Sequence, residues 1–132
     1  MRARSIVGGF FLTMGGVHIG LVSADTEIYR HFADGALIPG LSTLWQDVFM
    51  AHPAVWGLLV AAFEITCGTL MLMGGRTARL GWVAVLAFHV ALMGFGWGFW
   101  AWSVPVLTVL VPAALIDWAR LSPKAAPRAR PA

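Results

Sequence analysis

Four runs of apolar residues, each close to twenty residues long, dominate this sequence. They cover about residues 5–22, 53–75, 80–97 and 102–118. A helix of about 20 residues, rising 1.5 Å per residue, crosses the roughly 30 Å hydrocarbon core of a bilayer. The leucines, valines and alanines show no alternation with a period of two, so a membrane β-barrel is a poor fit. The sequence therefore predicts an all-α fold, an integral membrane four-helix bundle, within residues 1–118.

The charge content agrees with a membrane protein. Only 11% of the 132 residues are charged, against about 25% in a typical soluble domain. The basic residues lie at the ends of the apolar runs rather than in a polar groove, so we expect the lipid bilayer as a partner and no nucleic acid. The single cysteine, Cys67, lies inside an apolar run and is expected to be a small buried side chain.

The placement of the basic residues predicts the topology. The long segment 23–52 carries four acidic residues and one arginine, whereas the tail 119–132 is basic and rich in proline and alanine. Most arginines outside the tail lie at the ends of the apolar runs that are opposite to segment 23–52. They are Arg2, Arg4, Arg76 and Arg79. Because cytoplasmic loops are enriched in lysine and arginine, we expect an N-in/C-in topology with a disordered cytoplasmic tail.

The segment 23–52 is too long to be a simple connector. The stretches "DTEIYRHFADGALIP" and "STLWQDVFMAHP" each predict a short interfacial helix on the outer surface. Ser42 or Thr43 is expected to cap the second of them, and Pro53 to begin the next membrane helix. Trp82 is expected to mark the opposite interface.

Glu64 is the most costly residue in the four runs. A charge at the centre of a membrane helix costs about 2.5–3.5 kcal/mol on insertion scales, so such groups normally face the bundle interior. Helical spacing places Ala61, Cys67 and Gly68 on the same face, and small residues there permit close packing or a cavity. We expect Glu64 to face inward, either as a protonated structural group or as a catalytic proton carrier.

Two histidines are candidate partners for Glu64. His89 lies at the same depth in the third run and is expected either to share a proton with Glu64 or to bond a backbone carbonyl. His18 lies near the outer end of the first run, and it either completes a catalytic set with the other two or reaches interfacial water. Two histidines and a glutamate can also hold zinc or iron. No two of them are three or four residues apart, so we expect no metal site.

The stretch "GFGWGFWAW" at 94–102 is rich in glycine and aromatic residues. It predicts either an aromatic belt at the interface or an aromatic-lined mouth for a flat lipophilic ligand such as a quinone, with Trp97 in contact. Pro105 and Pro112 are expected to bend the fourth helix and open space near Thr108. Trp97 and Thr108 are therefore the candidate cofactor-binding residues.

The sequence "FEITCGTLMLMGGRTARLGWVAVLAF" resembles the DoxX-like family of small four-helix bacterial membrane proteins. Members show a glutamate, then glycines and leucines, then a G-x-x-T-R turn. The corresponding residues here are Glu64, Gly68, Leu70, Leu72, Gly74, Arg76, Thr77 and Arg79. The opening "IVGGFFLTMGGVHIG" is also similar to the start of that family. The resemblance implies a four-helix bundle in the bacterial inner membrane and an association with quinone-linked oxidoreductases.

Three functions fit these features. In the first, the bundle forms a pocket in which Glu64, His89 and His18 bind or protonate a quinone- or isoprenoid-like ligand, as part of a membrane oxidoreductase. In the second, the protein is a non-catalytic anchor or assembly subunit that docks a protein partner through the outer loop 23–52. In the third, it is a small proton-coupled exporter, although the first helix lacks the early carboxylate that such exporters carry.

Overall fold

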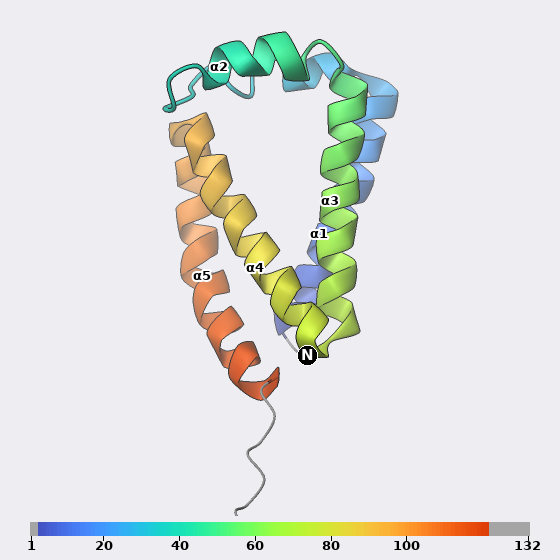
Figure 1. Cartoon of the computed structure of the whole chain (residues 1–132), viewed down its shortest axis with the longest axis vertical. Coiled ribbons are helices and arrows are strands. Elements are labelled where there is room, and N and C mark those ends of the chain that lie inside the picture. Colours follow the sequence, from blue (N-terminus) through green and yellow to red (C-terminus); the bar gives the residue numbers. More distant parts are fainter. Residues whose placement is uncertain (1–2, 122–132) are drawn as a thin grey trace, which may run out of the picture.

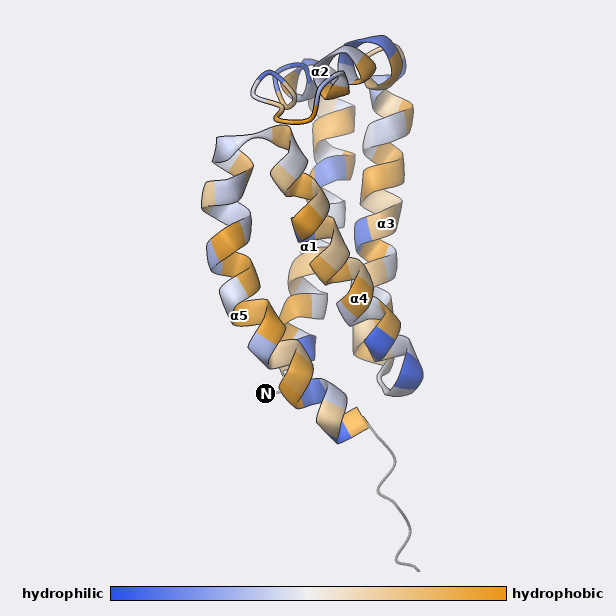
Figure 2. Ribbon diagram, turned by 60° about the vertical axis from the view of Figure 1, so that its left-hand side comes forward, coloured by the Kyte–Doolittle hydropathy of each residue, from blue (hydrophilic) through white to orange (hydrophobic). Residues whose placement is uncertain are grey.

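The structure is a computed structural model that describes residues 3–121, and every regular element within that range is helical. Four long helices run along the molecule (Figure 1): α1 (Ala3–Ala24), α3 (Pro53–Met73), α4 (Gly75–Leu92) and α5 (Trp97–Leu121). Each of these four helical segments is long and apolar enough to cross a membrane, and Figure 2 shows hydrophobic residues along all four. The prediction of four helices that are long and apolar enough to cross a membrane is confirmed. The disordered tail was predicted to begin at residue 119, but residues 119–121 belong to α5, and the rest of the tail lies outside the described residues.

The connections between the last three helices come earlier than the sequence suggested, and the first of them is also shorter. Helix α4 begins at Gly75 and α5 at Trp97, where later starts, near 80 and 102, were expected. Glycines explain the difference, because Gly74, Gly75 and Gly96 have φ angles of 80°, 59° and 119°. Glycine adopts this left-handed region without strain, so Gly74 alone separates α3 from α4, and Gly96 ends the four-residue turn before α5.

Residues 25–52 form a cap across one end of the bundle (Figure 1). The cap contains three short elements: η1 (Thr26–Tyr29), α2 (Leu41–Leu44) and η2 (Trp45–Phe49). Neither Ser42 nor Thr43 occupies the N-cap of α2, which is instead Gly40 with a φ of 81°. Pro53 stands in the first turn of α3, where its missing N–H costs no hydrogen bond.

Glycines set the distance between α1 and α3. A Cβ atom on Gly68 would lie 2.6 Å from the carbonyl oxygen of Gly8, and one on Gly8 would lie 3.0 Å from the carbonyl oxygen of Gly68. Gly15, about two turns further along α1, is similarly close to α3, because a Cβ atom on it would lie 3.0 Å from the carbonyl oxygen of Ala61. A Cβ atom on Gly9 or Gly16 would meet nothing within 4 Å. The first glycine of each pair therefore lets the two backbones touch.

The helix pair α1 and α3 diverges from the pair α4 and α5. Helices α1 and α3 lie side by side, and α4 slants away from them toward the capped end, where α5 accompanies it (Figure 1). At the opposite end the pairs converge on a buried core: Phe11, Cys67, Met71, Trp82, Val85, Leu110 and Ala114. The bundle is thus packed at one end and held apart beneath the cap.

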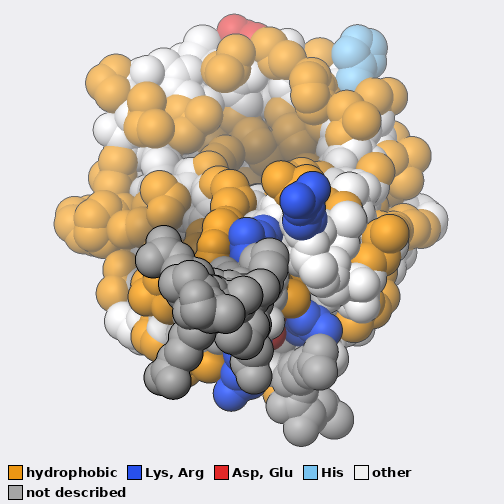
Figure 3. Space-filling model, turned by 60° about the horizontal axis from the view of Figure 1, so that its bottom comes forward, with side chains coloured by type: hydrophobic (Ala, Val, Ile, Leu, Met, Phe, Trp, Pro, Cys, Tyr) orange, Lys and Arg blue, Asp and Glu red, His pale blue; other side chains and the backbone are white. Residues whose placement is uncertain are grey.

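The packed end also holds a buried polar cluster. Asp117 is 3% exposed and accepts a hydrogen bond of 3.1 Å from Trp82 Nε1. Arg4 Nη1 lies 3.9 Å from the same carboxylate oxygen, and the Arg79 guanidinium lies 5.1 Å from the centre of the Trp118 ring. Arginine side chains gather at this end, called the basic end below (Figure 3). The expectation that Trp82 marks the interface is wrong, because its indole is fully buried.

Candidate functional site: a cavity beneath the cap

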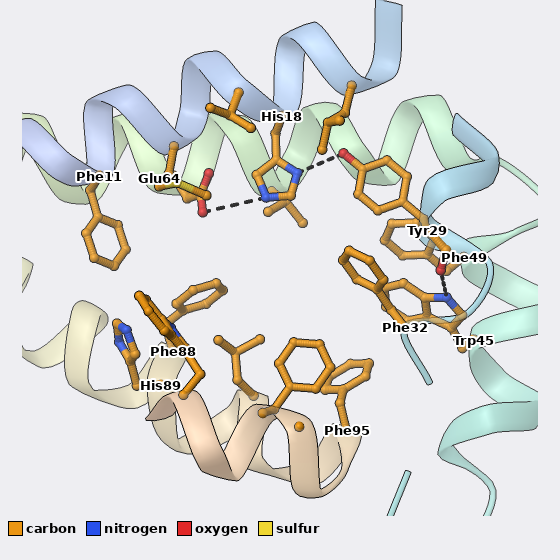
Figure 4. A pocket seen from close by; sticks show the side chains of 18 of the residues that line it. Phe11, His18, Tyr29, Phe32, Trp45, Phe49, Glu64, Phe88, His89 and Phe95 are labelled. Carbon is orange, nitrogen blue, oxygen red and sulfur yellow. Dashed lines mark hydrogen bonds and ion pairs between the residues drawn. The ribbon is translucent and has the colours of Figure 1, made fainter. Parts of the chain in front are cut away.

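A cavity of about 650 Å³ lies between the two helix pairs, directly under the cap. Its walls come from all four long helices and from the cap, and most of the lining side chains are aromatic or aliphatic (Figure 4). Four titratable side chains line it: His18, Tyr29, Glu64 and His89. A concave, mainly apolar space with a few polar groups is typical of a small-molecule site, and its volume falls in the usual range.

Glu64 and His18 face each other across the α1–α3 contact. His18 Nε2 lies 3.7 Å from Glu64 Oε1, and the Glu64 residue is only 3% exposed. The second oxygen, Oε2, is buried without a hydrogen-bond partner among residues 3–121. Glu64 shares its buried face with Ala61, Cys67 and Gly68, as the helical spacing predicted. The carboxyl group therefore keeps hydrogen-bonding capacity that the described protein groups do not use.

Tyr29 extends this pair into a chain of three residues. Its hydroxyl oxygen lies 2.7 Å from His18 Nδ1. Burial raises the pKa of Tyr29, and the Glu64 carboxylate adds to the increase, so the phenol stays protonated. In the neutral His18 tautomer that carries its proton on Nε2, the Tyr29 hydroxyl donates to Nδ1 and the Nε2 proton lies toward Glu64. We call Tyr29, His18 and Glu64 the polar chain.

The cap holds Tyr29 in place. Trp45 Nε1 donates to the Tyr29 carbonyl oxygen at 2.8 Å, and the Trp45 ring stacks on Phe49 at 3.8 Å between centroids. The cap is fastened to the corner between α4 and α5, where a Cβ atom on Gly96 would overlap the Gly35 carbonyl. The cap thus roofs the cavity and supplies one member of the polar chain.

His89 lies on the opposite wall of the cavity (Figure 4). Its Nδ1 donates to the Val85 carbonyl oxygen at 2.9 Å, and its ring meets Phe11 edge-on at 6.0 Å. The expectation of a proton shared between Glu64 and His89 is wrong; Glu64 is paired with His18, and His89 bonds a backbone carbonyl. The two residues lie at similar depth but on diverging helices. Since Nδ1 is engaged, Nε2 is the His89 nitrogen available to a ligand.

The two candidate cofactor-binding residues lie away from the cavity. Trp97 is 71% exposed and Thr108 donates to the Pro105 carbonyl oxygen on the exposed surface of α5. The same stretch does line the cavity, but through Phe99 and Trp102. Phe99 and Trp102 are three residues apart on α5, so helical periodicity places both on the side of the helix that borders the cavity.

Sequence reasoning missed three residues with buried polar groups, Tyr29, Ser103 and Asp117. Tyr29 is the only tyrosine of the chain, but it lies in the short element η1 of the cap, and no local pattern brings it to His18. Asp117 had a clear signal, since it is a carboxylate inside the fourth apolar run. The argument that selected Glu64, the cost of a charge in a membrane helix, also applies to Asp117, although with less force, because Asp117 lies four residues before the end of α5.

Among residues 3–121, no three His, Cys, Asp or Glu side chains gather as a metal-binding group. No family model, curated protein or solved structure matches this chain. The case for its function therefore stands on the residues and geometry of the cavity.

Proposed function

We propose that this protein binds a lipophilic ligand, quinone- or isoprenoid-like, in the cavity beneath the cap and exchanges a proton with it through the polar chain. One observation carries the proposal: a roomy, aromatic-walled cavity inside a membrane bundle contains a buried carboxyl group with an unpartnered oxygen. Flat ligands stack on aromatic side chains, and a carbonyl or hydroxyl on the ligand would satisfy the unused hydrogen-bonding capacity.

The setting of this function is the bacterial inner membrane, with the protein as a DoxX-like component of a membrane oxidoreductase. The resemblance between residues 63–88 and that family supports this assignment. The arginines at the basic end favour an orientation with that end and both termini in the cytoplasm, because positively charged ends stay inside. The cap and the polar chain would then lie on the outer side.

The polar chain suits proton exchange. Glu64 accepts or donates the proton next to the ligand, His18 relays it, and Tyr29 connects the pair to the cap. His89, on the far wall, offers a second hydrogen-bonding group to the other end of a flat ligand. Electrons for any redox step would come from a partner protein, since the polar chain contains no electron carrier.

The Glu64→Leu substitution is expected to weaken ligand binding about tenfold, because the hydrogen bond that the protonated Glu64 carboxyl donates to a quinone carbonyl, worth about 1.4 kcal/mol, is lost. The probe is a short-chain benzoquinone titrated into the purified protein in lipid nanodiscs. Binding is followed through quenching of tryptophan fluorescence, since Trp45 and Trp102 line the cavity. Tyr29→Phe, which removes only the hydroxyl, should have a smaller effect in the same direction.

The matched control is Glu27→Leu, which removes a carboxylate on the exposed cap surface that pairs with Arg30 outside the cavity. Its affinity should equal that of the wild type. If the wild type shows no saturable quenching, or if Glu64→Leu binds as tightly as the wild type, the proposed function fails. A non-catalytic anchor that docks another protein would then be the remaining reading.

A further inference from the structure

The exposed part of the cavity wall comes from two helices only. Of the lining residues on the long helices, Phe10, Val17, Gly98 and Trp102 are exposed, and they belong to α1 and α5. The lining residues on α3 and α4, Glu64 and His89 among them, are buried or half-buried. The cavity therefore has a mouth between α1 and α5, formed by these four exposed residues.

The other sides of the cavity are closed. Glycine contacts hold α1 against α3, and the rings of Phe63 and Phe88 bridge α3 and α4 with centroids 5.5 Å apart. The cap covers one end with Tyr29 and Phe49, whose rings are 5.3 Å apart. The packed core closes the opposite end. A ligand that comes from outside passes through the mouth.

The mouth lies below the ends of the membrane helices. Val17 is seven residues before Ala24, the last residue of α1, and Trp102 is five residues after Trp97, the first of α5. At 1.5 Å per residue these positions are about 10 Å and about 8 Å inside the helix ends. Because all four mouth residues are apolar or glycine, the mouth faces the acyl chains of the lipid.

We infer that the ligand reaches the cavity sideways from the bilayer, between α1 and α5, and that it is an uncharged amphiphile whose polar head enters first. The head would meet His18, one residue after Val17 in the chain, and then Glu64, while an apolar tail remains in the mouth. A charged head group, such as the phosphate of a phospholipid, would pay a large desolvation cost in this passage and is excluded. This inference rests on the proposed ligand site and adds the route and the charge of the ligand.

Gly98→Leu tests the route. A Cβ atom on Gly98 meets nothing within 4 Å, and the residue lines the cavity at the mouth, so a larger side chain has room there and narrows the passage. We expect the association rate of the short-chain benzoquinone to fall at least tenfold, as measured by stopped-flow quenching in proteoliposomes. The matched control is Gly16→Leu, on α1. A Cβ atom on Gly16 also meets nothing within 4 Å, and Gly16 does not line the cavity. Its association rate should equal that of the wild type.

A second measurement needs no variant. At a fixed aqueous concentration of benzoquinone, the association rate to the wild type should follow the mole fraction of the probe in the membrane as its tail is lengthened. A rate that follows only the aqueous concentration, or an unchanged rate in Gly98→Leu, would overturn lateral access. Both results differ from failure of the ligand site itself, in which the wild type shows no saturable binding at all.

Discussion

Replacing Asp117 by alanine is expected to lower the free energy of unfolding by about 3 kcal/mol, because removing one partner of a buried polar cluster leaves the others unsatisfied. Trp82 Nε1 would lose its acceptor at 3.1 Å, and Arg4 would lose the carboxylate that lies 3.9 Å away. These contacts join α1, α4 and α5 at the basic end. The measurement is steric trapping or denaturant titration of the purified protein in bicelles.

Two further variants separate the charge from the hydrogen bond. Asp117→Asn keeps an acceptor for Trp82 but leaves the Arg4 charge without its partner, so its loss should be smaller than that of alanine. Adding Arg4→Met to Asp117→Asn should restore much of the stability, since no uncompensated charge remains. Asp47→Ala, at an exposed position of the cap, is the control and should stay within about 0.5 kcal/mol of the wild type. An Asp117→Ala protein as stable as the wild type would refute this role.

Replacing Gly68 by alanine is expected to cost about 2 kcal/mol, a typical penalty for forcing extra atoms into a packed contact. The new Cβ atom would lie 2.6 Å from the Gly8 carbonyl oxygen, a backbone atom that cannot move away like a side chain. The α1 and α3 backbones must therefore separate. The same separation moves His18 away from Glu64, so ligand binding should fall together with the unfolding midpoint.

Gly9→Ala provides the control for Gly68→Ala. Gly9 lies on α1 beside the contact, but a Cβ atom there meets nothing within 4 Å. Because alanine is a better helix former than glycine, this variant should be as stable as the wild type or slightly more so. If Gly68→Ala and Gly9→Ala have the same unfolding midpoint, the close packing of the α1 and α3 backbones at Gly68 is refuted.

The sequence alone was sufficient to predict the features of the fold that follow from the apolar solvent of a bilayer. Four runs of suitable length predict four helices, and the cost of a buried charge identifies Glu64 as an inward-facing residue. The inward face of α3 was also predictable, because a period of 3.6 places Glu64, Cys67 and Gly68 together. These properties depend on local sequence and solvent alone.

The partners within the site depend on how the helices cross, which no local pattern reports. Equal depth suggested His89 as the neighbour of Glu64, but α4 slants away from α3 and the glycine contact brings α1 close instead. His18 is therefore the neighbour. Trp97 was expected at the end of the third apolar run, but α5 already begins there, and the Trp97 side chain is exposed. Tyr29 belongs to the cap, and tertiary contacts of the cap, rather than a local sequence pattern, place it beside His18.

Mass spectrometry of solvent extracts from the purified protein tests the central claim, a lipophilic ligand in the cavity, most directly. Three proteins are compared: the wild type, a cavity-filling Val60→Trp variant and a Val90→Trp control. Val60 lines the cavity, whereas Val90 is 59% exposed on the outer surface of α4. The account predicts about one uncharged amphiphile per protein in the wild type and the control, and its loss from Val60→Trp. Extracts containing only bulk phospholipid, in equal amounts from all three proteins, would contradict it.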